Sequence, residues 1–206
     1  DLNSEIAMCL DSMPLYEESK KSIQESVRKT SLWAKKCKET HKKLQKKVPK
    51  NKKQLLFGIT QGGIHKDLRE KSIKELLKLN FDGYSIGGFR MGETFTQEMK
   101  IVKQQKKLIP ENKPVYLMGI GSPNEILEAI SLGVDMFDSR MPTQSARRGT
   151  LYTNKGRVKI LNKKFENNKN PIDKKCECFA CKNYSKAYIR HLLKNQESVG
   201  MELASI

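Results

Sequence analysis

Residues 55–63 have the sequence Leu55-Leu56-Phe57-Gly58-Ile59-Thr60-Gln61-Gly62-Gly63, which shows most clearly the pattern that indicates the fold. This is a short apolar run that ends in a polar, glycine-rich turn, and an amphipathic segment follows it as far as Leu79. A strand of a parallel sheet is typically such a continuous apolar run, and its crossover helix is typically amphipathic. The same order recurs along the chain, with further apolar runs at 6–10, 83–86, 115–118 and 134–137.

Five strand–helix units in succession predict an α/β fold with a parallel sheet. Besides the segment ending at Leu79, helices are expected at about 16–46, 95–108 and 122–133. The unbroken alternation favours a (β/α)8 TIM barrel over an open doubly wound sheet, and five strands make only an incomplete barrel.

The pattern changes after Asp138. Residues 150–160 alternate around Asn154-Lys155-Gly156 as a hairpin, a polar loop covers 167–175, and 183–194 is predicted to be a helix. We therefore expect two domains, a partial barrel at 1–149 and, at 150–206, a basic zinc-binding subdomain together with the start of the last helix.

The formal net charge of +17 is concentrated in two blocks. Residues 140–195 hold 15 Lys or Arg against three acids, and residues 35–53, at a helix end and the following loop, hold ten Lys against Glu39. Such blocks can bind phosphates, and the alternative is that they are solvated lysine-rich faces. No stretch of the sequence approaches the ~20 apolar residues of a membrane span, so we expect a cytoplasmic protein that does not associate with a membrane. Cys9 and Cys37 have no evident partners, which argues against a disulfide framework.

Polar residues, glycines and one methionine occupy the carboxyl ends of the predicted strands, where parallel barrels place their active sites. They are Asp11, Gln61, Gly87, Gly88, Met118, Gly119 and Asp138. An acid, an amide and exposed backbone N–H groups suit the edge of a flat heterocycle. The alternatives are that Asp11 only caps the next helix, that the glycines only form turns, and that Met118 belongs to the core.

Asp138 is the strongest candidate for catalysis. It ends a strand and is followed by Arg140, Arg147 and Arg148, which favour an ionised carboxylate. A positioned carboxylate can attack the anomeric carbon of a sugar. The alternative is a structural salt bridge with Arg147. Asp135, in the same strand, should point to the opposite side because side chains alternate.

Three cysteines, Cys176, Cys178 and Cys181, form a C-x-C-x-x-C pattern. They supply three thiolates for zinc, whose structural sites take four ligands. His191 is the histidine that follows them in the sequence. A redox-active or simply buried triplet is the alternative.

Taken together, these motifs resemble the tRNA-guanine transglycosylase family. The matching stretches are 57–63 (FGITQGG), 81–88 (FDGYSIGG), 92–93 (GE), 116–121 (YLMGIG), 135–138 (DMFD), 141–143 (MPT) and the cysteine triplet with 184–188 (YSKAY). The resemblance implies a TIM barrel with an inserted zinc subdomain. It also implies that the wobble guanine of certain tRNAs is exchanged for a 7-deazaguanine, queuine or its aminomethyl precursor.

The resemblance also assigns roles to residues. Asp138 would be the nucleophile that bonds to the ribose, and the flipped-out base would be bound by a pocket of seven residues: Asp11, Gln61, Gly87, Gly88, Phe89, Glu93 and Met118. The tRNA anticodon loop would be held by Thr143, Gln144, Arg147 and Arg148. Zinc would be held by Cys176, Cys178 and Cys181, with a His immediately beyond Ile206 as the fourth ligand, and the full-length protein would be a homodimer.

The chain differs from the usual bacterial pattern at Ser12-Met13, at Phe89-Arg90-Met91 and at Gln144, so the identity of the inserted base stays open. The family has about three further strands ahead of the stretch matched here, one of them bearing the general base. We therefore expect strands four to eight of the barrel, and no base exchange by this stretch alone. Two other functions remain open, a noncatalytic RNA-binding subunit of a heterodimeric transglycosylase and a zinc-containing barrel hydrolase for small molecules. The retained Asp138, Asp11 and Gln61 favour the transferase over the former, and the basic block favours it over the latter.

Overall fold

The computed structural model describes residues 4–15, 18–89 and 92–206, and its contacts divide the chain into two compact units, 1–138 and 139–206. The division follows Asp138, whereas the sequence placed the boundary after residue 149. Helix α5 (Met141–Arg147) contacts strand β6 (Thr150–Thr153) and helix α8 (Ser198–Ser205), and it therefore lies within the second unit.

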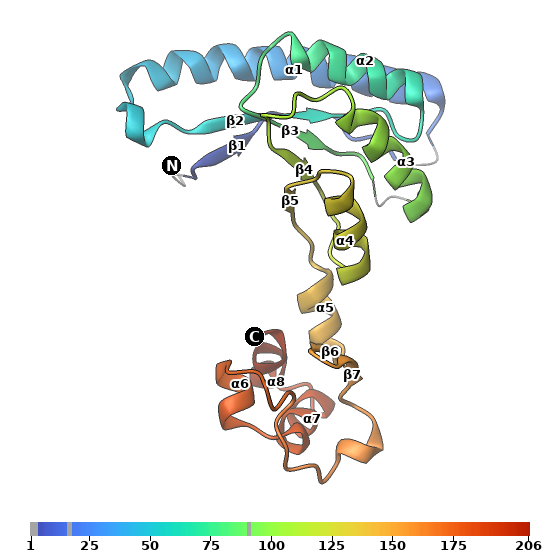
Figure 1. Ribbon diagram of the computed structural model, residues 1–206, viewed down its shortest axis with the longest axis vertical. Coiled ribbons are helices and arrows are strands. Elements are labelled where there is room, and N and C mark those ends of the chain that lie inside the picture. The colour runs from blue at the N-terminus through green and yellow to red at the C-terminus, as the bar shows by residue number, and fades with distance from the viewer. Residues whose placement is uncertain (1–3, 16–17, 90–91) are drawn as a thin grey trace. The chain divides into compact units, whose positions relative to one another are not determined.

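Unit 1 is a parallel α/β structure whose strands follow one another in chain order (Figure 1). Its elements are β1 (Ile6–Met8), α1 (Lys20–Leu44), η1 (Gln45–Lys47), η2 (Lys50–Lys52), β2 (Leu55–Thr60), α2 (Lys66–Leu77), β3 (Gly83–Ile86), α3 (Phe95–Lys106), β4 (Val115–Leu117), α4 (Pro123–Ser131) and β5 (Met136–Phe137). Each strand pairs in parallel with the next one, so the sheet order is β1-β2-β3-β4-β5. The carboxyl ends of all five strands therefore lie along one edge of the sheet.

Local sequence explains where the helices of unit 1 begin. Ser19 caps α1 by accepting a hydrogen bond from the Ser22 N–H, and Thr94 and Gln97 form a reciprocal capping box at α3. Pro123 opens α4, where its missing N–H is not needed. The predicted helix start at Tyr16 lies outside the described residues. The lysine-rich stretch after residue 35 is helical as far as Leu44 and continues through η1 and η2.

The core of unit 1 lies between the sheet and its helices. Figure 1 shows α1 and α2 side by side along the sheet, and both contact β2. Buried side chains of the strands, such as Ile59, Ile86 and Leu117, belong to the same cluster as Ile73 of α2 and Val102 of α3. The predicted incomplete TIM barrel is confirmed, because the five strands form a curled parallel sheet with its helices in alternation.

Unit 2 is a small domain with its own core. Its elements are α5, β6, β7 (Gly156–Lys159), η3 (Lys163–Phe165), α6 (Phe179–Asn183), α7 (Lys186–Lys194) and α8. The predicted hairpin is present as the antiparallel pair β6–β7, and Leu151, Ile160, Ile189 and Leu203 are buried in one cluster. The predicted helix over 183–194 begins at Lys186, because Ser185 caps it by accepting from the Tyr188 N–H. Helices α5 and α6 were not predicted.

Candidate active site and metal centre

A hydrogen bond joins the ends of the first two strands of unit 1. Gln61 Nε2 donates to Asp11 Oδ2 at 2.6 Å, and the Gln61 N–H donates to Ser72 Oγ at 3.0 Å. Gln61 is completely buried, and within the described part of the chain its Oε1 accepts no hydrogen bond. Asp11 does not cap α1, a role that Ser19 fills. The pair therefore places a carboxylate at the edge of the sheet, beside a buried amide oxygen that has no donor among the described residues.

Gly88, at the end of β3, lies against this pair. Its φ is +72°, and a Cβ placed there would overlap Gln61 Oε1, so both the backbone conformation and the space require glycine. Across the described residues, neither the Gly88 N–H nor the Phe89 N–H has a protein acceptor, whereas the Gly87 N–H donates to Thr60 O at 3.2 Å. Two adjacent backbone donors are thus available beside Asp11 and Gln61.

Sequence reasoning missed Arg69, a fully buried residue in the first turns of α2. Its guanidinium donates to four backbone carbonyls, those of Gly63 (2.7 Å), Thr60 (3.3 Å), Gly87 (2.8 Å) and Gly88 (3.4 Å). Burial lowers the pKa of Arg69 to about 9, and the negative charge of Glu93 opposes this shift, so the side chain stays charged at neutral pH. In the sequence Arg69 looks like one more solvated helical cation, and its position six residues after Gly63 is the only available signal.

Asp138 follows β5 and is held by β4 and the turn after it. Its Oδ1 accepts from Tyr116 Oη at 2.6 Å and from the Gly119 N–H at 3.1 Å. Burial and the hydrogen bond and charge of Asp138 raise the pKa of Tyr116, so its hydroxyl keeps the proton. Tyr116 was also missed, although it lies two residues before Met118 and therefore on the same side of the strand.

The neighbours of Asp138 agree with strand alternation. Asp135 Oδ2 accepts from the Val115 N–H at 2.8 Å, a role in the sheet itself. Met118 is half-buried and packs against the main core, and its N–H approaches Ile86 O at 3.5 Å. Asp138 is exposed. Met118 therefore serves the core on one side and leaves part of its surface for contact at the sheet edge.

Two groups of predicted site residues thus occupy one edge of the sheet. The first is Asp11, Gln61 and Gly88, and the second is Gly119 with Asp138. In the described ranges no hydrogen bond joins the groups directly, but β3, which ends before Gly88, and β4, which ends before Gly119, are paired neighbours. Glu93, predicted to support the pocket, lines a hollow of about 310 Å³ that also touches Gly88.

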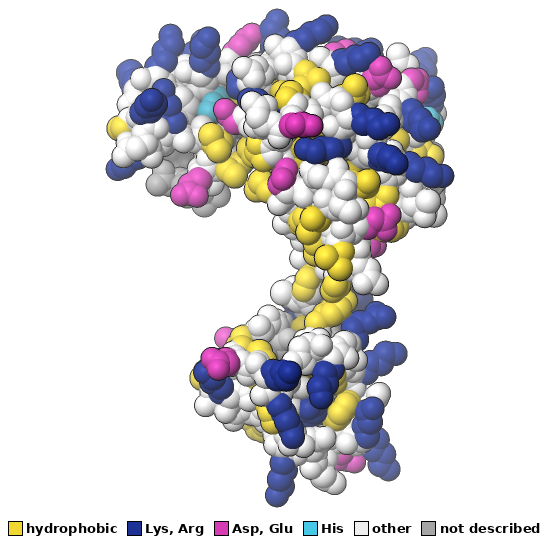
Figure 2. Space-filling model, in the orientation of Figure 1, with side chains coloured by type: hydrophobic (Ala, Val, Ile, Leu, Met, Phe, Trp, Pro, Cys, Tyr) yellow, Lys and Arg dark blue, Asp and Glu magenta, His cyan; other side chains and the backbone are white. Residues whose placement is uncertain are grey.

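The residues predicted to hold RNA share one short helix of unit 2. Thr143, Gln144 and Arg147 lie in α5 and Arg148 follows it. Arg147 and Arg148 are exposed, Gln144 is half-buried, and Thr143 Oγ1 donates to Arg140 O at 3.2 Å. On the face drawn in Figure 2, Lys and Arg side chains, in dark blue, cover much of unit 2. The basic block is therefore a real surface of this unit.

The three cysteines of unit 2 converge. Their sulfur atoms all lie within 4.8 Å of one another, as three ligands of one metal ion would. Cys178 Sγ accepts from the Cys181 N–H at 3.5 Å, and the Cys176 N–H donates to Asp173 O at 3.3 Å. The Cys181 N–H lowers the pKa of Cys178, whereas burial raises the pKa of Cys181. The group could hold a metal ion, and a hollow of about 510 Å³ lies beside it.

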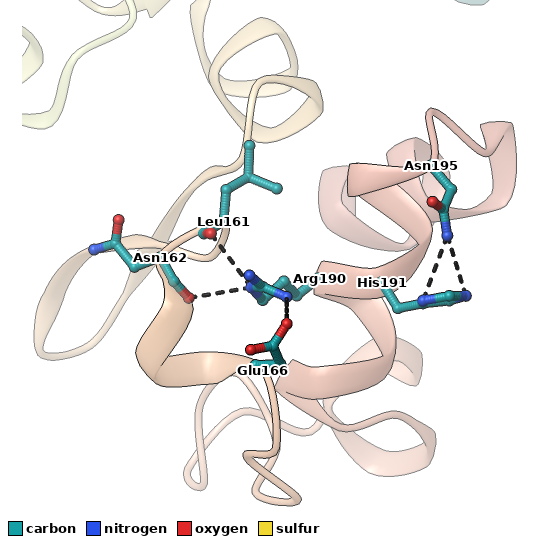
Figure 3. Close-up of polar contacts among 6 residues, drawn as sticks. All are labelled: Leu161, Asn162, Glu166, Arg190, His191 and Asn195. Carbon is teal, nitrogen blue, oxygen red and sulfur yellow. Dashed lines mark hydrogen bonds and ion pairs between the residues drawn. The ribbon is translucent and has the colours of Figure 1, made fainter.

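His191 does not join this cluster. Figure 3 shows its ring facing Asn195, whose Nδ2 lies 3.2 Å from Nε2 and 3.4 Å from Nδ1. Within the described ranges, the group that converges as metal ligands consists of the three cysteines.

No helix among the described residues combines the length and the apolarity that crossing a membrane requires.

Comparison with known sequences shows the family to which the chain belongs. The family model described as Queuine tRNA-ribosyltransferase matches residues 1–206. Proteins of that name from Staphylococcus haemolyticus and Macrococcus caseolyticus are 45% and 44% identical over 206 residues, and one from Lysinibacillus sphaericus is 44% identical over 205. Each alignment covers 100% of this chain and 52% of the relative, so the chain spans about half the length of the curated relatives it matches. The chain belongs to the queuine tRNA-ribosyltransferase family.

Proposed function

We propose that the complete protein exchanges the wobble guanine of specific tRNAs for a 7-deazaguanine, queuine or its aminomethyl precursor. Membership of the family supports the reaction class, since the relatives are named queuine tRNA-ribosyltransferase. The observation that carries the proposal is the environment of Asp138. Two donors fix its Oδ1, and the exposed side chain leaves Oδ2 for a substrate.

In the proposed reaction Asp138 Oδ2 attacks C1′ of the target ribose. The C1′–N9 bond breaks, its electron pair stays on N9 of the purine, and solvent donates a proton to the departing guanine. The incoming base then attacks C1′ through N9, its N9 proton passes to solvent, and the bond to Asp138 Oδ2 breaks to release the carboxylate. The hydroxyl of Tyr116 and the Gly119 N–H stabilise the carboxylate each time it carries full charge.

The first group of site residues suits recognition of the departing and incoming bases. A guanine edge presents N1–H and N2–H donors and an O6 acceptor. In our proposal Asp11 and Gln61 Oε1 accept from the donors, and the N–H groups of Gly88 and Phe89 donate to O6. Glu93 supports the loop, Gly87 provides its turn, and Met118 packs on the face of the base.

The basic surface of unit 2 suits the backbone of the RNA. Arg147 and Arg148 expose their charges beside Thr143 and Gln144, and phosphate contacts of this kind orient a nucleic acid without reading its sequence. We propose that these residues hold the anticodon loop. The target nucleotide leaves its stack to reach Asp138.

We propose zinc as the metal of the cysteine cluster. Three convergent thiolates are the donor set that zinc prefers, and the Cys181 N–H that approaches Cys178 Sγ further stabilises a thiolate. The family resemblance supplies a His as the fourth ligand. Bound zinc would fix the fold of unit 2 and take no part in base exchange. From the same resemblance we propose a homodimer, which size-exclusion chromatography with light scattering tests, and a cytoplasmic location, where the tRNA substrate is.

The test uses the complete protein and labelled guanine exchange into cognate tRNA. Asp138→Asn should lower exchange by about 10⁴-fold or more, because the amide is a poor nucleophile. Without an incoming base, the wild-type protein should form an RNA adduct that survives a denaturing gel, and the variant should not.

Asp135→Asn is the matched control for the Asp138 variant. Its amide oxygen can still accept from the Val115 N–H, so exchange should stay within a few-fold of wild type. An adduct that persists in Asp138→Asn would remove Asp138 as the nucleophile. Absence of exchange by the wild-type protein, with RNA binding intact, would favour the noncatalytic subunit.

A further inference from the structure

Arg69 is a charged side chain that is completely buried in unit 1. Its guanidinium has no accessible surface, and the partners described above are backbone carbonyls. Burying a cation is unfavourable unless its donors are satisfied. Four carbonyls and the Phe89 ring, whose centroid lies 4.2 Å from Cζ, meet that need here. Four backbone carbonyls and one aromatic ring therefore contact the guanidinium at the same time.

The four carbonyls come from two neighbouring strand ends. Thr60 and Gly63 belong to the end of β2, and Gly87 and Gly88 to the end of β3. A guanidinium is a rigid planar fork of five N–H donors, so it fixes the two turns relative to each other. Both turns carry groups proposed to read the base, since Gln61 lies between Thr60 and Gly63.

The carbonyl bonds also set the direction of two N–H groups. In a trans peptide the C=O and the N–H of the same unit point in opposite directions, and the described chain has no cis peptide. Because the carbonyls of Gly87 and Gly88 point at Arg69, the N–H groups of Gly88 and Phe89 point away from it. Neither of these two donors has an acceptor in the described part of the protein.

We infer that Arg69 is the positioning residue of the base-recognition loop: by binding two successive carbonyls it aims two successive N–H groups at the purine. This inference rests on the proposed function and deepens it, because it assigns the affinity for the base to a side chain that never touches it. Arg69 acts on guanine and on the incoming 7-deazaguanine alike, since both present an oxygen at that edge.

Arg190 of unit 2 provides a matched control. It is also a buried arginine, and it binds the carbonyls of Leu161 (3.3 Å) and Asn162 (3.1 Å) and the Glu166 carboxylate (3.4 Å), as Figure 3 shows. These partners belong to unit 2 and carry no proposed site residue. A role limited to folding predicts the same result for substitutions at either arginine.

The experiment compares Arg69→Lys and Arg190→Lys in the complete protein. Steady-state guanine exchange gives KM for guanine and for tRNA separately, and thermal unfolding gives Tm. For Arg69→Lys we expect KM for guanine to rise about tenfold or more while KM for tRNA stays within about twofold, since lysine cannot bind both carbonyls in the same geometry. For Arg190→Lys we expect a lower Tm with both KM values unchanged.

Chemical rescue gives a second readout. Arg69→Ala leaves a space of the shape of guanidinium, so a non-denaturing concentration of guanidinium chloride should restore KM for guanine, and sodium chloride at equal ionic strength should not. If the Arg69 variants do not fold, Phe89→Leu removes the ring that stacks on the guanidinium and should raise KM for guanine a few-fold.

The outcomes separate the two claims. An unchanged KM for guanine in a folded Arg69 variant, or in Phe89→Leu where the Arg69 variants do not fold, overturns the inference and leaves the proposed function standing. An equal rise in KM for guanine and tRNA also overturns it. No exchange by the wild-type protein removes the proposed function, and the inference falls with it.

Discussion

The two units hold their candidate sites by different means. In unit 1, side chains and backbone groups of the protein bind one another, as Gln61 binds Asp11 and Tyr116 binds Asp138. In unit 2, three sulfur atoms lie within 4.8 Å of one another, and the Cys181 N–H donates to Cys178 Sγ. Protein groups thus hold the candidate site of unit 1 through hydrogen bonds, whereas the cysteines of unit 2 form a group that could hold a metal ion. Four experiments test this contrast.

Removal of the zinc that we propose should have the largest effect, and that effect should be confined to unit 2. Metal binding energy in small zinc modules is folding energy, on the order of 10 kcal/mol, because the unfolded chain has no formed site. After chelation, or in Cys178→Ser, amide hydrogen exchange should increase across 139–206 and stay constant in the strands of unit 1. Cys37→Ser, in α1, is the control. Equal loss of protection in both units would contradict the contrast.

Gly88→Ala should come second. The left-handed backbone and the overlap with Gln61 Oε1 act together, so we expect a loss of about 1–3 kcal/mol in unfolding free energy, with weaker guanine binding. Gly156→Ala is the control, because Gly156 also has a positive φ but a Cβ there would meet nothing within 4 Å. The Gly88 variant should lose more stability than the Gly156 variant, and a smaller loss would show that the overlap relaxes freely.

Tyr116→Phe should affect catalysis alone and leave the stability of the fold unchanged. It removes one of two hydrogen bonds to Asp138 Oδ1, and a bond to a charged group contributes about 1.5–3 kcal/mol, so kcat should fall about tenfold or more. Because burial and Asp138 raise the pKa of Tyr116, its hydroxyl stays protonated and the ratio of the two rates should be constant from about pH 6 to 9. Tyr152→Phe, in unit 2, is the control. A ratio that changes over this range would mean that Tyr116 transfers a proton.

Asp67→Asn should have the smallest effect. Asp67 pairs with Lys20 at 2.8 Å on the surface, and that bond lowers the pKa of the carboxyl below 3.8. A lowered pKa adds stability that is present above 3.8 and is lost as the pH falls through the folded value. The Tm difference from wild type should be slight at neutral pH, smaller in high salt and absent in strong acid. Glu177→Gln, at the exposed 3.6 Å pair of unit 2, should be equally mild, and a large shift in either would reveal a network beyond the pair.

The sequence predicted the frame of both units because local patterns set it. The run at 55–60 and the run at 83–86 are strands with the predicted bounds, since apolar residues end there at glycine or polar turns. The hairpin follows from Asn154-Lys155-Gly156 in the same way. The convergence of Cys176, Cys178 and Cys181 follows from their spacing.

The remainder depends on contacts that no local pattern contains. Helix α6 is nucleated when Cys178 Sγ accepts from the Cys181 N–H. Arg69 looks like a surface residue of α2 until the ends of β2 and β3 surround it. Sequence reasoning therefore misses residues that position other groups, as Arg69 does through backbone carbonyls and Tyr116 through its hydroxyl.

The order of the sheet has a consequence for synthesis. Because each strand pairs with the one that follows it in the chain, no strand has to insert between two that are already joined. As the ribosome releases the polypeptide, each of the strands β2 to β5 can pair with the strand that emerged before it, and this pairing does not require a later strand. The described sheet can thus grow in the direction of translation, and Asp138, which follows β5, joins a sheet whose other four strands are already paired.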